Sequence, residues 1–444
     1  MSDLYDVIIV GAGTAGSYFA YLLCKEGFKV CVIEKELEEN VRKDVEVVHF
    51  PTDGFKEFGL DEPKEGDSDF VEIFTDMYGR SALNDHETLN RFPVTVIYLH
   101  EFIERLKNLA INEGAEFIYG ALVHSFLRDE LNNIIGVQFN KDGFSESIKG
   151  RLIVDASGIR SVLRRQSDSE YIETKEIGKN DRFFVLLYYV KFDKGLTDRV
   201  ATSWPYFKAW IDDYRKERTG AVIGCGASHS PEYVRKRMKV FLDSIPHDSF
   251  KIVREELGST PYNRTPYSFV GDNFLIIGDT ALLTNPMNGE GITWNFRFLS
   301  RIKDVVFEAL RKNNLSISSL WDVNTIYQKS IGASSSYTRA AMKGVMDSNP
   351  KDNDFLYKNH IIFKSDTDEA PKNTVSVLFN GVKNKEYSFK AFKSLIKQSS
   401  IASKIKKHYE KYPNSPKGYK KWAKRADKLW MKAGHISDID KDVI

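Results

Sequence analysis

The chain has 444 residues and a formal net charge of +2, with 28% of its residues charged. This length predicts about two to three domains with a large core, and the balanced charge gives no overall argument for a nucleic acid partner. The longest apolar run, Phe183 to Val190, is far shorter than the about 20 residues that span a bilayer, and the chain opens on a strand pattern instead of a signal sequence.

The amino-terminal elements predict a dinucleotide site. Asp6 to Val10 form an apolar run typical of a strand, and Gly11-Ala12-Gly13-Thr14-Ala15-Gly16 then opens a helix-forming stretch through Cys24. In such a fingerprint the first glycine allows the tight turn, the second lets a pyrophosphate reach the helix amino terminus, and the third allows close helix packing. A second strand, Lys29 to Ile33, ends at Glu34, where a carboxylate binds an adenosine ribose. A tight turn without a ligand is the alternative.

Another predicted strand, in the first half of the chain, ends with the acidic residue Asp155. Arg151 to Asp155 is an apolar run that closes on a carboxylate, and a Ser157-Gly158 turn and basic residues up to Arg164 follow it. This segment repeats the order of strand, acid and glycine turn seen at the amino terminus.

The long insertions between the nucleotide segments predict a second domain that holds the substrate. Its expected strands are Arg182 to Phe192, Trp204 to Ile211 and Thr219 to Ala227, which are rich in aromatic and β-branched residues, and a helix is expected over Tyr233 to Leu242. Aromatic side chains of these strands are candidates for lining an apolar tunnel, namely Tyr188, Tyr189, Trp204, Tyr206, Phe207 and Trp210. Cys225, between two glycines, is a further pocket candidate. Ordinary sheet packing and an inert buried thiol are the alternatives.

Residues 274 to 291 predict a flavin site. Phe274 to Ile277 form a short apolar strand that delivers Gly278 and Asp279 to the edge where open α/β sheets bind ligands, so Asp279 is placed to accept hydrogen bonds from a sugar-alcohol chain. Pro286 breaks the following loop. Gly289 and Gly291 let the backbone approach a planar ring and begin a helix through Trp294 and Phe298, whose amino terminus favours negative charge on a reduced flavin.

After about residue 312 the pattern is mostly helical, and the last part is basic. Between Lys404 and Lys432 eleven lysines or arginines interleave with apolar and aromatic residues. Peripheral contact with an anionic membrane is one interpretation. A packed helix pair with a solvated basic face is the other.

Cysteines and histidines set further expectations. Cys24, Cys31 and Cys225 are too few for a disulfide framework, which favours a reducing cytoplasm. The nine histidines show no metal-ligand spacing, so no metal site is predicted. Neither a second glycine fingerprint nor a redox-active cysteine pair is present, so the electron donor, a nicotinamide or an electron-transfer protein, stays open.

The three nucleotide segments, in this order, resemble the para-hydroxybenzoate-hydroxylase-like flavoproteins, and most closely the geranylgeranyl reductase family. The tail sequences Leu320-Trp321-Asp322 and Tyr412-Pro-Asn-Ser-Pro416 are also similar to archaeal members, so the resemblance covers nearly the whole chain. By this resemblance FAD is the cofactor, and its contacts fall at Ala15, Glu34, Lys35, Val123, Asp279, Gly291 and Ile292.

The fold that this resemblance implies is α/β with three parts. A discontinuous Rossmann-like FAD-binding domain is expected at 1–47, 94–170 and 265–311. An antiparallel-sheet substrate domain is expected at 48–93 and 171–264, and a mostly helical region at 312–444.

The implied activity is reduction of carbon–carbon double bonds in a long apolar, polyprenyl-like substrate by hydride from reduced flavin. The family's Pro-x-x-Cys-Gly loop is absent, and the corresponding stretch from Arg42 to Phe50 offers only Glu46 or His49 as a proton donor, so no catalytic residue is predicted. The substrate motif Tyr-x-Trp-x-Phe-Pro is also missing before Gly224-Cys225-Gly226. The alternatives are a flavin monooxygenase or halogenase of the same superfamily and a non-catalytic flavin- or lipid-binding protein.

Overall fold

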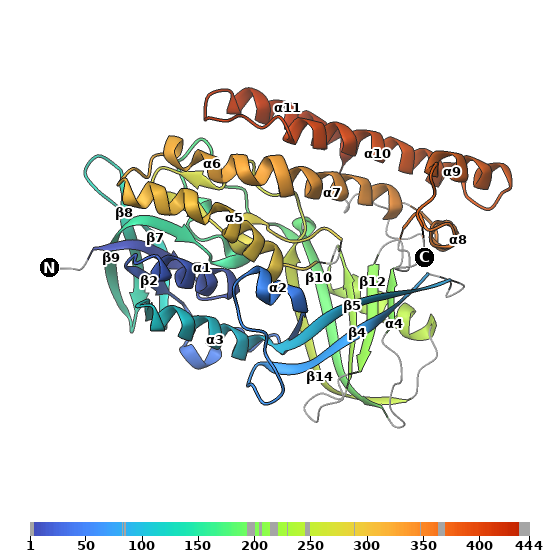
Figure 1. The fold of residues 1–444 in the computed structure, drawn as a ribbon, viewed down its shortest axis with the longest axis horizontal. Helices are drawn as coiled ribbons and strands as arrows, with labels where there is room; N and C mark the ends of the chain where they lie inside the picture. The colour runs from blue at the N-terminus through green and yellow to red at the C-terminus, as the bar shows by residue number, and fades with distance from the viewer. Residues whose placement is uncertain are drawn as a thin grey trace.

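The computed structural model describes residues 4–81, 83, 86–192, 200–203, 207–213, 221–228, 230–244, 249–287, 289–346, 348–362 and 369–434, with the backbone alone at 90, 200–203, 207–213 and 244. Figure 1 shows one mixed sheet at the amino-terminal end, a second sheet beside it, and a layer of carboxy-terminal helices that lies along both. The α/β fold with a parallel sheet, an antiparallel sheet and carboxy-terminal helices is confirmed.

The first sheet has the order β15-β16-β9-β1-β2-β6, with β7 and β8 joined to the antiparallel half of β9. Its strands are β1 (Tyr5–Val10), β2 (Val30–Ile33), β6 (Glu116–Ile118), β7 (Ala121–Arg128), β8 (Ile134–Lys141), β9 (Phe144–Asp155), β15 (Val270–Gly271) and β16 (Phe274–Ile276). The strands β16, β9, β1, β2 and β6 run parallel.

The register of these parallel strands brings their ends to one edge. Val10 lies opposite both Ile33 and Asp155, and Asp155 lies opposite Ile276. Gly11 follows Val10, Glu34 follows Ile33, and Asp279 lies three residues after Ile276. The sheet therefore gathers the glycine turn, Glu34, Asp155 and Asp279 at the carboxyl ends of its strands, where α/β sheets bind ligands.

Helices cover the first sheet and form one large core with it. They are α1 (Thr14–Lys25), α3 (Leu99–Asn112), α5 (Ile292–Arg311) and α6 (Ile317–Tyr327). The sheet strands are nearly continuous apolar runs because both of their faces are covered, and β1 and β2 are buried along almost their whole length. The predicted first and second strands and the first helix are confirmed to within one or two residues.

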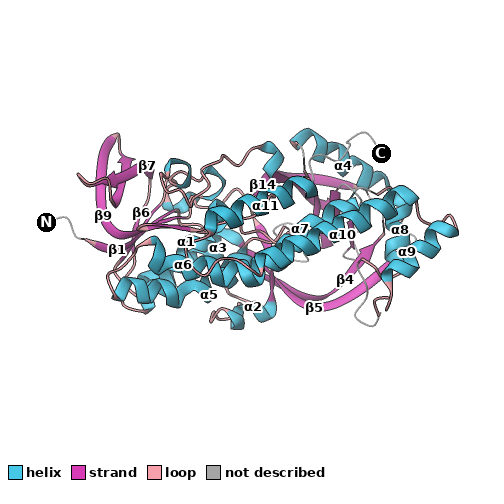
Figure 2. Cartoon of the chain, turned by 90° about the horizontal axis from the view of Figure 1, so that it is seen from above, coloured by secondary structure: helices cyan, strands magenta, loops and turns pink. Residues whose placement is uncertain are grey.

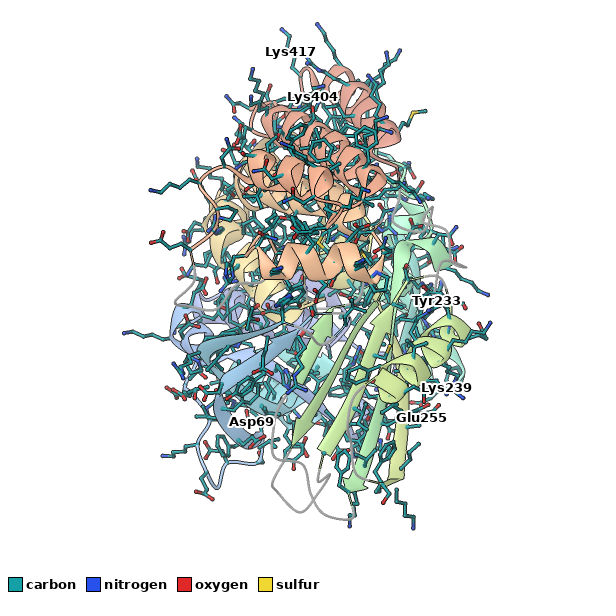
Figure 3. The ribbon with its side chains drawn as sticks, turned by 90° about the vertical axis from the view of Figure 1, so that its right-hand side faces the viewer. Asp69, Tyr233, Lys239, Glu255, Lys404 and Lys417 are labelled. Carbon is teal, nitrogen blue, oxygen red and sulfur yellow. The ribbon has the colours of Figure 1, made fainter. Side chains whose placement is uncertain are left out.

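The second sheet has the order β14-β10-β13-β12-β11-β4-β5-β3. Its strands are β3 (Val47–Pro51), β4 (Phe70–Arg80), β5 (Glu87–Tyr98), β10 (Arg182–Phe192), β11 (Val200–Ser203), β12 (Phe207–Asp213), β13 (Ala221–Ala227) and β14 (Phe250–Pro261). The short helix α2 (Thr52–Glu57) follows β3, and α4 (Pro231–Ser244) packs on β13 and β10. Tyr233 and Lys239 of α4 lie on the outer side of this sheet (Figure 3). The strand predicted over Arg182 to Phe192 is confirmed with the same bounds.

The proposed domain boundaries fall close to the changes of sheet. The strand β3 begins at Val47, and β5 crosses the proposed boundary between residues 93 and 94. Short 3₁₀ segments lie in the connections between the two sheets, at Glu38–Asn40, Gly158–Arg160, Arg164–Gln166 and Lys179–Asp181. A further one, Gly278–Ala281, lies between β16 and α5.

The carboxy-terminal region is helical, as predicted. It contains α7 (Ala333–Met346), α8 (Pro350–Lys358), α9 (Thr374–Lys383), α10 (Phe389–Tyr409) and α11 (Tyr419–Ala433), and a π-helical turn, Gln328–Gly332, joins α6 to α7. The helices α7 and α10 lie side by side along the length of the molecule (Figures 1 and 2). Within the described residues, no helix combines the length and the apolar composition that crossing a membrane requires.

The basic tail separates its charges from its aromatic rings. Ile405, Tyr409, Tyr412, Tyr419 and Trp422 are buried in a cluster that includes Tyr267 and Trp321. Lys404 and Lys417 lie at the far end of the molecule with their side chains directed outward (Figure 3). The rings that the membrane interpretation places at an interface are therefore part of the core, and the exposed basic face remains.

Candidate cofactor and active site

The turn after β1 needs its glycines for two different reasons. Gly11 has a positive φ of 111°, and a methyl group there would lie 2.4 Å from the carbonyl oxygen of Ala156. A methyl group at Gly16 would lie 2.0 Å from the carbonyl oxygen of Gly11. At Gly13 it would meet no atom within 4 Å. Gly11 and Gly16 are thus required by the packing of the protein itself, whereas Gly13 keeps open the space at the amino terminus of α1.

The carboxylate of Glu34 lies against this turn. Its Oε2 accepts a hydrogen bond of 2.8 Å from the backbone N–H of Ala12, and its Oε1 accepts one of 3.0 Å from that of Glu36. The side chain is 8% exposed, so it is fixed at the edge of the turn with little access to water. This is the position that the sequence predicted for an adenosine ribose contact.

The other predicted contacts at this end of the site lie around Glu34. Lys35 is exposed and forms an ion pair with Glu36. Val123 is buried on β7, the strand whose first residue, Ala121, donates its N–H to the carbonyl oxygen of Glu34 at 2.9 Å. Two segments that are far apart in the sequence therefore meet at the end of β2.

Asp279 lies where three other segments converge. A methyl group at Gly278 would lie 3.3 Å from the Cβ of Ala15 in α1, and one at Gly291 would lie 3.8 Å from Oδ1 of Asp279. Burial raises the pKa of the Asp279 carboxyl, and the nearby charge of Arg42 opposes this shift. In the described part of the chain, no hydrogen-bond donor reaches this carboxylate. It is a half-buried acceptor that a hydroxyl-bearing ligand would satisfy.

The loop after Asp279 is held through its backbone. The carbonyl oxygen of Pro286 accepts a hydrogen bond of 2.8 Å from the hydroxyl of Tyr262. Gly289 has a positive φ of 78° with open space around it, and Gly291 is the N-cap of α5 without any side-chain cap. Ile292, the first residue of α5, packs beside Val41. The amino terminus of α5 therefore keeps backbone N–H groups available beside Asp279.

Asp155 has a different role from Asp279. Its carboxylate accepts hydrogen bonds from the N–H and hydroxyl of Ser157 at 3.0 and 2.5 Å, and from the N–H groups of Leu163 and Arg164 at 2.9 and 2.7 Å. The hydroxyl of Thr280 is a fifth donor, at 3.4 Å, so Asp155 fixes the connection after β9 and has no need of a ligand.

These features fit FAD. The open space at Gly13 lies at a helix amino terminus that carries neither a side-chain cap nor an acid in its first turn, as a pyrophosphate requires. Glu34 and the unsatisfied carboxylate of Asp279 lie at the two ends of this edge, where a ribose and the ribityl chain present hydroxyl groups. Within the described residues, no cluster of side chains suited to a metal ion is found.

The loop between β2 and β3 carries polar residues that the sequence pattern alone did not connect. Arg254 on β14 forms ion pairs with Glu46 at 3.0 Å and with Glu256 at 2.6 Å, and the hydroxyl of Tyr189 donates to Glu256 at 3.0 Å. Burial raises the pKa of the Glu256 carboxyl, and Arg254 partly offsets this. Sequence separations of 67 to 210 residues within this cluster explain why no local pattern revealed it.

His49, the second proton-donor candidate, lies on β3 opposite Val96, with its ring 5.6 Å from that of Phe74. It follows Val47 on the same face, which packs with the apolar cluster of β4 and β5. Glu46 and His49 thus border one apolar face of the second sheet. Arg42, at the start of the same loop, lies close enough to Asp279 for its charge to oppose the rise that burial causes in the pKa of that carboxyl.

The aromatic candidates of the second sheet divide between its faces. Tyr188 and Cys225 pack toward α4, on the outer face, while Tyr189 and Val222 pack toward β4 and β5. Burial raises the pKa of the Cys225 thiol, which agrees with an inert buried cysteine. Trp204 and Tyr206 lie outside the described residues, and for Trp210 only the backbone of β12 is described.

Comparison with known proteins agrees with this cofactor assignment. The profile of the family described as FAD binding domain matches residues 4–236, more than half of the chain. A digeranylgeranylglycerophospholipid reductase of Haloferax volcanii is 28% identical over 313 residues, which cover 66% of this chain and 73% of the relative.

Two solved structures share the fold. A geranylgeranyl bacteriochlorophyll reductase-like protein of Thermoplasma acidophilum has a TM-score of 0.72 and 17% identity, covering 89% of this chain and 99% of that protein. The myxobacterial chondrochloren halogenase CndH has a TM-score of 0.61 and 15% identity, covering 90% of this chain and 97% of that enzyme.

The glycine turn, the half-buried acceptor Asp279 and the match over residues 4–236 lead to one conclusion. The chain belongs to the FAD binding domain family and is an FAD-dependent oxidoreductase with geranylgeranyl reductase-like relatives.

Proposed function

We propose that this protein reduces carbon–carbon double bonds of a long apolar, isoprenoid lipid substrate. The observation that carries the proposal is its similarity over most of the chain to a digeranylgeranylglycerophospholipid reductase, combined with a cofactor edge whose acceptor Asp279 is unsatisfied without a ligand. When bound, FAD would supply the hydride.

In this proposal two groups of residues hold the cofactor. The turn residues and Glu34 hold the adenosine and pyrophosphate part, and Asp279 with the loop before α5 holds the flavin part. The full proposed set is Gly11, Gly13, Ala15, Gly16, Glu34, Lys35, Val123, Gly278, Asp279, Pro286, Gly289, Gly291 and Ile292.

An isolated alkene offers no polar handle, so the protein must orient it by shape and keep water away. The face of the second sheet that carries Val71, Phe74, Val96 and Val222 is apolar and borders the loop from Arg42 to His49. We assign the substrate chain to this face. Tyr188 and Cys225 lie on the opposite face and therefore leave the proposed set of pocket residues.

The second hydrogen requires a proton donor near this face, and Glu256 is our candidate. Its pKa is raised by burial, which favours a carboxyl that keeps its proton closer to neutral pH, and it is hydrogen-bonded to Tyr189. Glu46 shares Arg254 with it, so the two carboxyl groups and the arginine form one charged cluster. Such a cluster would replace the cysteine that this chain lacks.

The test is anaerobic. The purified protein is photoreduced, geranylgeranylated lipid is added, and flavin reoxidation is followed together with the mass of the extracted lipid. We expect reoxidation without oxygen and a gain of two hydrogens per bond, and a slower reaction in Glu256→Gln with unchanged photoreduction. A flavin that stays reduced until oxygen is admitted would contradict the proposal.

The second candidate is an oxygen-dependent enzyme related to flavin halogenases, which the similarity to the chondrochloren halogenase favours. The sequence opposes it, because the halogenase motif Trp-x-Trp-x-Ile-Pro is absent and Ser157-Gly158 stands where related hydroxylases carry Asp-Gly. Oxygenated or halogenated product in the same assay would favour this candidate. An unchanged lipid would favour a non-catalytic binding protein.

The electron donor and the place of the protein in the cell belong to the same proposal. A transiently docking nicotinamide or an electron-transfer protein would reduce the flavin. We propose a cytoplasmic protein whose basic face on α10 and α11 makes peripheral contact with membranes that contain the lipid.

A further inference from the structure

A cavity of about 260 Å³ lies between the carboxy-terminal helices and the segment that follows β14. Its walls come from the segment after β14, from α7 and from the end of α11. The lining residues are Tyr262, Asn263, Arg264, Arg339, Lys343, Trp430, Met431 and Gly434. Three of these eight residues are cations and none is an acid.

Arg339 is the residue in this cavity that lacks a partner of opposite charge. Its Nη2 donates to the carbonyl oxygen of Thr284 at 3.2 Å, and its guanidinium lies 4.9 Å from the centre of the Tyr262 ring. Its Nη1 is buried and donates to no acceptor, and among the described residues no carboxylate pairs with this side chain. A half-buried cation without a counterion is costly, so this site favours an anion.

The neighbouring cations differ in how far their charge is already compensated. Arg264 forms two hydrogen bonds of 2.8 Å with Glu173, so its charge is matched within the protein. Lys343 lies one helical turn after Arg339 on α7 and brings a second cation to the same wall.

The remaining walls are aromatic or apolar. Tyr262 and Trp430 line the cavity, and the Met431 side chain at its rim is 81% exposed. A group that combines a compact anion with an apolar chain matches both kinds of wall. Arginine binds phosphate through its guanidinium N–H groups, and the Nη1 of Arg339 has no acceptor within the described part of the protein.

We propose that this cavity binds the phosphate group of a phosphorylated isoprenoid lipid and thereby anchors the polar end of the substrate. This inference rests on the proposed function for the identity of the apolar chain. The anion site itself rests on Arg339 and the cavity alone.

The cavity is connected to the cofactor edge through backbone contacts. Arg339 holds the carbonyl oxygen of Thr284, and Tyr262 holds that of Pro286. Both carbonyls belong to the loop between Asp279 and Gly291. A phosphate bound at Arg339 would therefore fix this loop while it anchors the substrate.

The first experiment measures binding without turnover. The melting temperature of the FAD-loaded protein is recorded with inorganic phosphate, geranylgeranyl phosphate or geranylgeraniol, for the unchanged protein, Arg339→Gln and the control Lys428→Gln on the exposed face of α11. We expect geranylgeranyl phosphate to raise the melting temperature of the unchanged protein and Lys428→Gln, and to have no effect on Arg339→Gln. An equal rise of the melting temperature in all three proteins would overturn the proposal. A rise with inorganic phosphate and none with geranylgeranyl phosphate would also overturn it.

A purely structural role of Arg339 predicts something different. If the arginine only supported the loop at Thr284, Arg339→Gln would melt earlier without any ligand and would lose FAD. If Arg339 instead serves to bind an anion, Arg339→Gln removes an uncompensated charge, and the ligand-free melting temperature stays equal or becomes higher. A ligand-free loss of stability and of FAD would count against the anion site.

The second experiment compares substrates in the anaerobic reoxidation assay. We expect KM for geranylgeranyl phosphate to rise at least tenfold in Arg339→Gln, and the preference over geranylgeraniol to disappear. Lys428→Gln should keep that preference. If no lipid reoxidises the flavin, the proposed function fails, while the melting experiment still decides on the anion site. An undiminished preference in Arg339→Gln would overturn the anchor.

Discussion

Two aspartates at the same edge of the first sheet show how differently the fold treats identical side chains. Asp155 is surrounded by five donors, whereas the carboxylate of Asp279 has none among the described residues. A saturated carboxylate stabilises its own loop, and an unsatisfied one is available to a ligand. The two side chains look alike in the sequence, because each comes at the end of an apolar run and close to a glycine.

The lack of donors around Asp279 within the described part of the chain predicts how the stability of Asp279→Asn depends on pH. Because burial raises the pKa of Asp279, the folded protein without FAD binds this proton more tightly than the unfolded chain does. The contribution of Asp279 to the free energy of unfolding is therefore favourable at pH values below the unfolded pKa of about 3.9. It becomes unfavourable as pH rises through the folded pKa. Asp279→Asn should remove this loss, so the variant without FAD should be equally or more stable at neutral pH.

The same variant should bind FAD about tenfold to a hundredfold more weakly, because a hydrogen bond to a charged group contributes about 1.5–3 kcal/mol. Flavin titration of the protein without FAD measures the affinity, and urea unfolding at acidic and neutral pH measures the stability. Asp304→Asn, on the exposed side of α5, is the matched control. FAD affinity equal to that of the control would contradict the assignment of Asp279.

At the scale of an element, the turn between β1 and α1 separates folding from binding. A side chain at Gly13 meets nothing in the protein, and the backbone there, with φ of −70°, accepts any residue. At Gly16 the backbone of Gly11 leaves no room for a side chain. The fingerprint thus contains one glycine that serves the ligand and others that serve the packing of helix on strand.

This difference predicts opposite behaviour of two similar variants. Gly13→Val should fold with a melting temperature close to that of the unchanged protein without FAD and should purify with little flavin, because the new side chain occupies the pyrophosphate space. Gly16→Val should fail to fold or melt much earlier. The ratio of flavin to protein absorbance and a melting curve check both. A Gly13→Val protein that purifies with the normal flavin content would contradict the proposed site.

Strand alternation separates the two faces of the second sheet at the same scale. The sequence predicted β10 with its observed bounds, yet it did not show which of Tyr188 and Tyr189 faces inward. The structure places α4 over Tyr188 and Cys225, and β4 and β5 over Tyr189. Neighbouring residues of a strand point to opposite faces, so only the packing of distant elements identifies the inner one.

In the whole molecule, the carboxy-terminal helices join the two sheets to a third layer through aromatic contacts. The hydroxyl of Tyr412 donates to the carbonyl oxygen of Tyr267 at 2.9 Å, and Trp321 Nε1 donates to that of Pro413 at 2.8 Å. Trp422 stacks on His408 and donates to its carbonyl oxygen at 3.0 Å. These contacts make the basic tail part of the folded unit.

We therefore predict that Trp422→Ala destabilises the protein by about 3–5 kcal/mol, as expected for deletion of a buried large aromatic side chain. Lys421→Ala, its exposed neighbour, should leave stability nearly unchanged. Urea unfolding of both variants measures the free energies, and binding to anionic vesicles is measured in parallel. A stable Trp422→Ala variant with impaired vesicle binding would instead place this ring at a membrane.

The sequence by itself determined the cofactor edge and most elements around it. Glycine turns, apolar strands and the acids that end them are local patterns, and the parallel register then brings Gly11, Glu34, Asp155 and Asp279 together. Local periodicity is enough for this, because each strand and helix is specified by its own residues.

Only the tertiary structure decided which of these acids is free for a ligand and which face of the second sheet is the inner one. It also decided that Arg339 lies half-buried with no counterion among the described residues. Each of these facts depends on donors, apolar side chains or charges that come from segments far apart in the chain. The cluster of Tyr189, Glu256, Arg254 and Glu46 is of the same kind. Hydrogen bonding, burial and charge pairing are properties of the packed neighbourhood, and no pattern within one segment contains them.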